Sequence, residues 1–275
     1  LDDSDGHIQT QLKSDHDSSS LSLGDIARID GNSGRQDLRG QGFELRTDGH
    51  GAIRAKEGLL ISTEGRTNAA AHITDMAETT SRLGQAQAQH QLQGEVAQDH
   101  RAQADGDQDQ VAKALEQQYK DIKGQGGDAE AGQFPELQQP HVVVASPAGI
   151  ESTTPHTTHQ HSGAHHAITS GGHSSVTAGK SLLVSARQAV KLFAYKTGME
   201  LISAKQDIDI TALETNINML AKAKITLSSD TIEIDATDEV LIVGGGSYTR
   251  WNAGGIDSGT AGSWSAHAAG HSQVG

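Results

Sequence analysis

The histidines are the residues whose type and spacing most suggest chemistry in this chain. Seven of its fifteen histidines lie between His141 and His173, and His159 and His161 form a His-x-His pair. Imidazole is a common ligand of iron, nickel and zinc, and such a pair repeated around a threefold axis offers six imidazoles. Histidines among Ser, Thr and Gly are also typical of the wet face of a strand, which needs no metal. We therefore predict no metal and no cofactor, and the His159/His161 region is where an ion would bind if the chain held one.

Motifs of hydrolytic or nucleotide chemistry are missing from the sequence. It contains neither a Gly-x-Ser-x-Gly elbow nor a His-Glu-x-x-His motif. The run Gly244-Gly245-Gly246 lacks the downstream Lys and Ser or Thr of a phosphate-binding loop. The absence of cysteine excludes thiolate chemistry and disulfide bonds. The sequence therefore predicts a protein that is not an enzyme.

Short strands must position these residues, because apolar residues recur in pairs spaced i, i+2 between Leu182 and Ile242. This spacing places both side chains on one face of a strand, while polar residues such as Asp209 and Asn218 take the other face. The pairs recur every seven to nine residues. They are Leu182/Val184, Val190/Leu192, Met199/Leu201, Ile208/Ile210, Ile217/Met219, Ile225/Leu227, Ile232/Ile234 and Val240/Ile242. A unit of this length suits one strand and a corner, so we predict a chain that winds around an axis as a β-helix or β-prism.

Composition favours an elongated or oligomeric body over a large globular core. The 275 residues include only 3% aromatic residues, which usually supply much of the area that a core buries, and carry a formal charge of -14. The acidic balance disfavours nucleic acid and anionic membranes, because both attract basic surfaces. No apolar run approaches the roughly 18 residues of a membrane span, and nothing resembles a signal peptide. Because the chain begins at Leu1 rather than Met, we expect it to be a fragment of a longer protein.

Residues 1–68 predict a neck and the first strands of a shaft. The strands are expected at residues 8–12, 21–29, 42–46 and 51–62, separated by turns such as Asp30-Gly31.

Residues 69–123 predict an α-helical hairpin insertion, because Ala, Gln, Asp and Glu dominate there and residues 105–107 break the pattern. The apolar stripe is thin, so we expect the hairpin to be docked on another part of the protein, and a surface that grips a cargo protein is the alternative. The stripe consists of Ile73, Met76, Thr80 and Leu83 in the first helix and Val111, Leu115, Tyr119 and Ile122 in the second.

The rest of the chain divides into three segments. Residues 124–155 hold all four prolines and predict a linker that returns to a strand, residues 156–246 predict the repeats of a β-helical shaft, and residues 247–275 predict a tail at its tip. The glycines of the run 244–246 predict either a corner or a point where three backbones converge, since only Gly permits so close an approach.

Several of these segments resemble VgrG, the spike protein of bacterial type VI secretion systems. The resemblance is carried by residues 42–48 (GFELRTD), 51–54 (GAIR) and 58–63 (GLLIST), with support from residues 146–150 (SPAGI), the helical insertion and the short repeats. Further support comes from Gly255-Ile256 and Gly259-Thr260 near the end. It implies a mainly β fold, a homotrimeric intertwined β-helix or β-prism needle with an inserted α-helical hairpin.

The resemblance also implies a mechanical function. A VgrG spike sits on a tube of Hcp, punctures the target membrane without spanning it, and carries a PAAR-type tip protein and an effector or adaptor protein. Such a spike is made in the bacterial cytoplasm and, after firing, is secreted or delivered into a target cell. The tip lies at the C-terminal end of the shaft, so the expected docking residues are Gly244, Gly245, Gly246, Trp251, Ile256 and Trp264. The alternative for Trp251, Ile256 and Trp264 is that they simply cap the end of the shaft.

Physical arguments agree with a homotrimer and leave two rivals. The apolar pairs of one chain are too few and too small to close a dry core alone, and a three-chain prism leaves open strand edges only at its ends. The first rival is a phage tail spike or trimeric adhesin shaft that binds a surface receptor, although few aromatics are present to build a receptor site. The second is a single-chain β-helix enzyme acting on polysaccharide, which would need more repeats and an acidic groove.

Overall fold

The computed structural model describes the chain except for residues 30–32, 70, 127–133, 271 and 273–275. The predicted turn at Asp30-Gly31 lies outside the described residues. The chain separates into two units, Leu1–Glu200 and Leu201–Gly275, which are described in turn.

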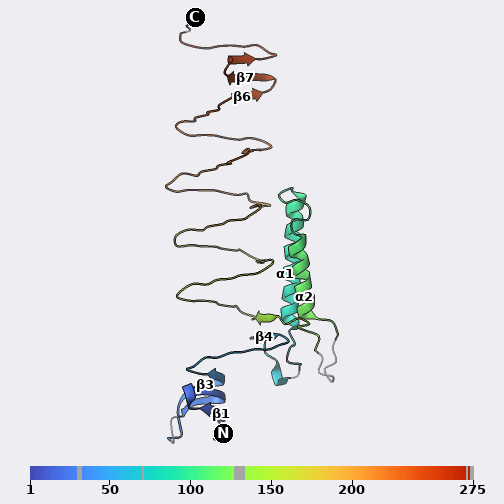
Figure 1. Ribbon diagram of the computed structural model, residues 1–275, viewed down its shortest axis with the longest axis vertical. Coiled ribbons are helices and arrows are strands. Elements are labelled where there is room, and N and C mark those ends of the chain that lie inside the picture. Colours follow the sequence, from blue (N-terminus) through green and yellow to red (C-terminus); the bar gives the residue numbers. More distant parts are fainter. Residues whose placement is uncertain (30–32, 70, 127–133, 271, 273–275) are drawn as a thin grey trace. The chain divides into compact units, whose positions relative to one another are not determined.

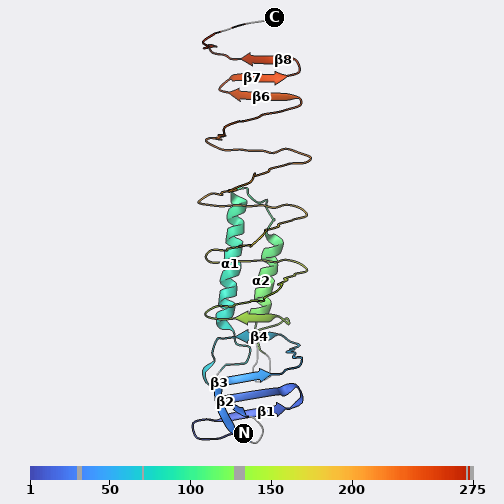
Figure 2. The ribbon, with the colours of Figure 1, turned by 90° about the vertical axis from the view of Figure 1, so that its left-hand side faces the viewer.

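The first unit opens with an antiparallel sheet in the order β1-β2-β3 (Figure 2). Its strands are β1 (Gln9–Ser14), β2 (Ser19–Ile29) and β3 (Arg35–Arg46). Strand β3 begins seven residues before the predicted strand, because the ladder to β2 continues past irregularities in the register as far as Ile29 and Arg35. The buried centre includes Ala27, whose backbone N–H donates to the amide oxygen of Gln9 at 3.0 Å.

The predicted strand at residues 51–62 is wrong for its first eight residues. Only β4 (Leu59–Ser62) forms, and it pairs in parallel with β5 (Val142–Ala145). Gly58 directly before β4 has a φ of 126°, a conformation that side chains disfavour and that bends the backbone at this point. The long insertion at residues 63–141 therefore leaves and rejoins the sheet between two neighbouring strands.

Two helices lie within the insertion, as the composition predicts. They are α1 (Ala77–Asp99) and α2 (Asp109–Lys123), which run side by side (Figures 1 and 2). They approach closely at Gly84, where an added Cβ would lie 3.3 Å from the ring of Tyr119. Neither helix is long and apolar enough to cross a lipid bilayer, as far as the described residues extend.

The predicted stripe of the first helix is wrong at its start. Ile73 lies before α1 and is 86% exposed, and Met76, which directly precedes the helix, is only 2% exposed. The helix begins late because residues 71–75 form turns in which the N–H of Asp75 donates to the carbonyl of His72. Met76 thus anchors the base of the hairpin rather than one of its faces.

Gly124 ends α2 in a conformation that no other residue tolerates at that place. Its φ is 67°, and an added Cβ would lie 1.3 Å from the carbonyl oxygen of Pro135. We expect Gly124→Ala to destabilise the hairpin by more than about 2 kcal/mol, because left-handed strain and a backbone clash act together. Gly126→Ala is the matched control, since Gly126 has the same φ of 67° but open space around it. Thermal melting followed by circular dichroism at 222 nm checks this, and equal melting of the two variants would show that Pro135 moves freely.

After β5 the first unit continues as an extended coil. Residues 146–200, all of them described, form neither a helix nor a strand ladder with another part of the chain. The backbone bends every eight residues, at 147–148, 155–156, 163–164, 171–172, 179–180, 187–188 and 195–197. Figure 1 shows this segment as a series of level runs joined by corners.

The second unit bends at intervals of seven to nine residues and ends in a small sheet. Its bends at 204–206, 213–215, 222–223, 229–230 and 237–238 separate the predicted apolar pairs. The strands expected at these pairs do not form in one chain until β6, because no segment of the unit lies beside them to accept their hydrogen bonds. The sheet is an antiparallel meander of β6 (Glu239–Gly244), β7 (Ser247–Asn252) and β8 (Gly255–Gly259), seen in Figure 2.

Candidate functional site

The α1–α2 hairpin is docked on the coil of its own unit through several side chains. Near its middle, the amide of Gln89 donates to the carbonyl of Ser170 at 2.7 Å, and His90 Nδ1 lies 3.5 Å from the hydroxyl of Thr169. At its far end, the ring of His100 lies 5.8 Å from that of Phe193 and 5.0 Å from that of Tyr195, centroid to centroid. Leu83, Leu115, Tyr119 and Ile122 line an apolar groove with Ala167 and Thr169, as expected of the predicted stripe.

An ion pair between Asp107 and Lys191 joins the turn of the hairpin to the coil. Both side chains are about one third exposed or more. The hydrogen bond from Lys191, with a second from the N–H of Ala104, lowers the pKa of the Asp107 carboxyl below its ordinary value. The carboxylate is therefore charged at neutral pH and keeps this contact.

The sequence pattern did not single out Asp107, Lys191, His100, Phe193 or Tyr195. The sequence does contain one signal for Phe193 and Tyr195. Only 3% of the residues are aromatic, yet these two lie two positions apart in one unit of the coil. Both have odd numbers, whereas the apolar pair of that unit has even ones. An aromatic on the face opposite the apolar pair needs a partner outside the coil, and the hairpin supplies it.

These contacts fix which way the coil side chains point. Successive side chains of an extended segment alternate between two faces. Ala167, Thr169, Lys191 and Phe193 face the hairpin, so even-numbered residues face the opposite, inner side throughout the eight-residue repeats. The apolar pairs of this unit, Leu182/Val184 and Val190/Leu192, are thus inward residues, yet each is more than half exposed in the single chain.

The same parity bears on the His159/His161 region, where an ion would bind if the chain held one. Both histidines have odd numbers, like the residues that face the hairpin, and their rings stack 6.4 Å apart. Within the part of the chain that the structure describes, no three metal-binding side chains come together.

The known rise of helix α1 gives the distance by which the coil advances along its axis. Phe193 lies 24 residues after Thr169, and the helix residues that they contact, His100 and His90, lie ten residues apart. Ten residues of α-helix span about 15 Å, and Figures 1 and 2 show α1 running along the direction in which this coil advances.

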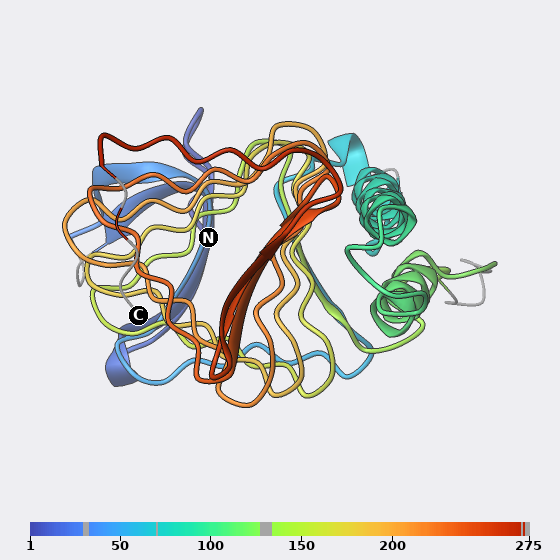
Figure 3. The ribbon, with the colours of Figure 1, turned by 90° about the horizontal axis from the view of Figure 1, so that it is seen from above.

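Thr169 and Phe193 face the same helix, so three eight-residue units make one turn. A solenoid whose turns stack directly advances only about 4.8 Å per turn. A rise of about 15 Å per turn therefore leaves room for two further strands between successive turns. Figure 3, viewed from above, shows the yellow-green turns of this unit following one another beside α1 and α2.

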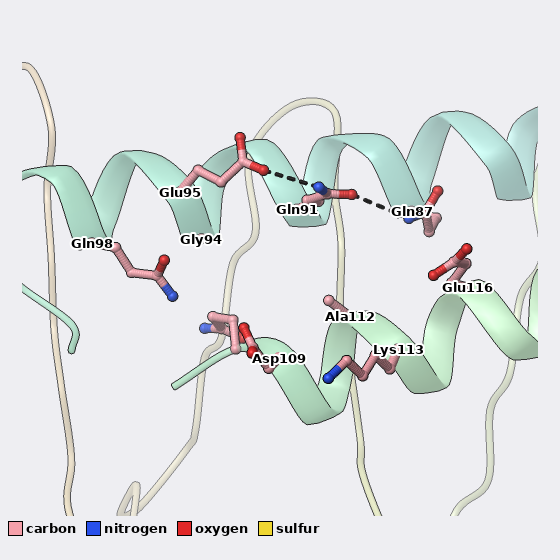
Figure 4. A pocket seen from close by; sticks show the side chains of 10 residues that line it. Gln87, Gln91, Gly94, Glu95, Gln98, Asp109, Ala112, Lys113 and Glu116 are labelled. Carbon is pink, nitrogen blue, oxygen red and sulfur yellow. Dashed lines mark hydrogen bonds between the residues drawn. The ribbon is translucent and has the colours of Figure 1, made fainter. Parts of the chain in front are cut away.

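A polar groove of about 300 Å³ separates the two helices (Figure 4). Gln87 donates to Gln91 at 3.5 Å and Gln91 donates to Glu95 at 2.9 Å, which forms a chain of hydrogen bonds along α1. None of the ten residues that line the groove is Ser, Thr, Cys or His. The groove therefore offers polar contacts but no pairing of a nucleophile with a base.

The structure brings some of the six predicted docking residues together in the second unit. Trp251 lies opposite Ile256 on β8 and opposite Val240 on β6, so both share the face of the inward pair Val240/Ile242. Trp264 and Gly244 line a groove of about 460 Å³ with Ile242.

Within one chain the run Gly244-Gly245-Gly246 makes a β-turn, which agrees with the predicted corner. Gly245 and Gly246 have φ values of 56° and 85° and connect β6 to β7 as a two-residue hairpin loop. They lie at the opposite end of this hairpin from Trp251, which faces Val240. The predicted docking residues thus form two groups and not one continuous site.

The other face of the meander is mixed, because Leu241 and Val243 of β6 lie opposite Arg250 and Tyr248 of β7. The hydroxyl of Tyr248 donates to Asp257 at 2.8 Å, and this hydrogen bond raises the pKa of Tyr248. Arg250 pairs with Glu239 at 3.1 Å. This face therefore combines a hydrogen-bonded and charged group with two apolar side chains, Leu241 and Val243, which are 46% and 66% exposed in the single chain.

Known proteins resemble the chain along most of its length. The family described as "Putative type VI secretion system Rhs element Vgr" matches residues 1–97, and the family described as "Uncharacterized protein conserved in bacteria (DUF2345)" matches residues 129–275. Two spike proteins of the type VI secretion system from Pseudomonas aeruginosa, VgrG2b and VgrG2a, are 31% and 30% identical over 83% of this chain. The chain spans only 22% and 26% of the length of these relatives.

Two solved structures share the fold. A VgrG spike from the type VI secretion system gives a TM-score of 0.80 at 26% identity and covers 96% of this chain and 94% of its own. A VgrG spike bound to the Tle1 effector gives 0.82 at 25% identity and covers 97% of this chain and 77% of its own. The fold defines a mainly β protein with a two-helix insertion. Together with the matching families, it shows that the chain belongs to the VgrG family of spike proteins.

Proposed function

We propose that three copies of this chain intertwine into the shaft of a type VI secretion spike. The observation that carries the proposal is the rise of about 15 Å per turn, measured against α1, because it equals about three strand spacings of 4.8 Å. Each turn then accepts one strand from each of two partner copies. The exposed inward pairs, such as Leu182/Val184, gain a common dry core in the same step.

The role of such a shaft is mechanical rather than catalytic. The strands of a closed three-chain prism are paired along its whole length, so edges that could bind other sheets remain only at its ends. Relatives named as spike proteins and a VgrG spike solved with a bound effector support a delivery role. The spike would stand on an Hcp tube in the bacterial cytoplasm, carry a PAAR-type tip and an effector or adaptor, and leave the cell or enter a target cell on firing.

Light scattering of the purified chain under native conditions tests this proposal. We expect a mass of about three times the 28.8 kDa of one chain, because the inward pairs cannot be covered within one copy. The mass should persist on dilution to submicromolar concentration, since an intertwined assembly separates only by unfolding. A folded monomer of one chain's mass would overturn the proposal.

A further inference from the structure

We propose that the α1–α2 hairpin of each chain lies across strands of both partner copies and clamps the trimer from outside. This inference rests on the proposed trimer and adds an inter-chain role for the hairpin. The hairpin touches its own coil at residues 167–170 and again at 191–195, one turn further on. Between these two levels it spans the space that the strands of the partner copies would fill.

Equal eight-residue units identify those strands. On the side that faces the hairpin, the units 165–170 and 189–194 of one chain would be separated by the unit 173–178 of one partner and the unit 181–186 of the other. The outward residues of these units have odd numbers, as established by the hairpin contacts. They are His173, Ser175 and Thr177 in the first of these two units and Ser181, Leu183 and Ser185 in the second.

The face of α1 toward the coil carries side chains that suit the polar outward residues of these partner strands. Gln93 and Ala97 share the face of His90 and His100, because residues three, four and seven apart lie on one side of a helix. Gln93 stands about 4.5 Å along the axis from His90, which is close to one strand spacing. It is exposed in the single chain, and at that level it would meet the outward hydroxyl that stands eight residues after Thr169.

Helix α2 carries an apolar residue, Val111, that suits the apolar outward residue Leu183. Val111 lies about one helical turn from Asp107, the residue that contacts Lys191. The strand one level below that contact carries Leu183, eight residues before Lys191. Leu183 is 88% exposed and stands on the outer side of the coil, so the inner core of the shaft cannot cover it. Val111 of a neighbouring copy is placed to do so.

Disulfide formation tests the clamp directly, since the chain has no cysteine of its own. The double variant Val111→Cys/Leu183→Cys is oxidised and run on a non-reducing denaturing gel. We expect bonds between copies that link most of the protein into a covalent trimer. The matched control is His90→Cys/Thr169→Cys, a pair that contacts within one chain, and it should close without any increase in mass.

The outcomes separate the two proposals. A monomer band for the 111/183 pair, in a sample whose native mass is trimeric and whose 90/169 control closes, overturns the clamp. A monomeric native mass overturns the trimer itself.

A second measurement does not depend on the geometry of a disulfide. Val111→Asp should lower the melting temperature of the trimer by about 3 °C or more, because it places a charge against Leu183 three times in each trimer. Lys113→Asp, which changes an exposed residue of the same helix, should leave it nearly unchanged. Equal melting of the two variants would contradict the clamp.

Discussion

Ile217→Asp is expected to abolish assembly of the spike. Ile217 opens one of the apolar pairs of the second unit and is 52% exposed in the single chain. In a three-chain shaft the substitution would bury three carboxylates around one axis without partners. Each unpaired buried charge costs several kcal/mol, so the summed cost of about 10 kcal/mol or more exceeds what a domain can lose. Light scattering should show monomer or aggregate in place of the trimer.

Asn218→Asp is the matched control for this prediction. It introduces the same carboxylate at the adjacent position of the same extended segment, and alternation places it on the outer face. We expect it to assemble and to melt within about 2 °C of the parent. An Ile217→Asp protein that assembles and melts like its control would show that the inward register of the second unit is wrong.

Truncation after Ser247 is expected to leave the trimer intact and to abolish co-purification with a PAAR-type tip protein. This change removes nearly all of β7 and β8, including Trp251 and Ile256, and exposes the edge of β6. A tip protein needs a defined end surface. In the intact chain the last paired strand, β8, provides one through its free backbone groups. Affinity capture of the trimer followed by quantification of the bound tip protein measures the effect.

A shorter truncation after Gly259 locates the contact more closely. It keeps the meander and removes the tail that carries Trp264, so we expect the tip protein to remain bound. Loss of binding in this variant would place the contact in the tail. Unchanged binding after the longer truncation would contradict a docking role for Trp251 and Ile256.

The apolar pairs allowed the period of the coil to be predicted, because a dry face repeats wherever a strand repeats. The pairs from Leu182 onward all fall between bends of the structure. In residues 156–179 the signal is weaker, because only Ile168 and Val176 continue the apolar pattern. Their even numbers agree with the contacts of Ala167 and Thr169, which face the hairpin.

Other features depend on contacts that sequence spacing does not encode. The early start of β3 reflects irregular pairing with β2, and the position of Met76 reflects burial at the base of the hairpin. Gly245 and Gly246 fit a corner or a convergence equally well as sequence, and their φ values agree with a corner within one chain. The candidate docking residues were chosen from the family's tip position, so their separation into two groups could not be foreseen.

The hairpin contacts also bear on how such a shaft avoids assembling out of step. Sliding one copy by eight residues against its neighbours would again set one apolar pair beside another, so the core alone discriminates weakly against slippage. The contacts of His90 with Thr169 and of His100 with Phe193 join α1 to a coil whose rise per residue differs from that of the helix. The paired side chains of helix and coil therefore match at only one offset along the axis. These contacts lie within one chain and relate the rise of its coil to that of the helix. A copy that enters with the wrong offset would then meet the hairpin with mismatched side chains, and the error would be rejected at the surface of the shaft rather than in its core.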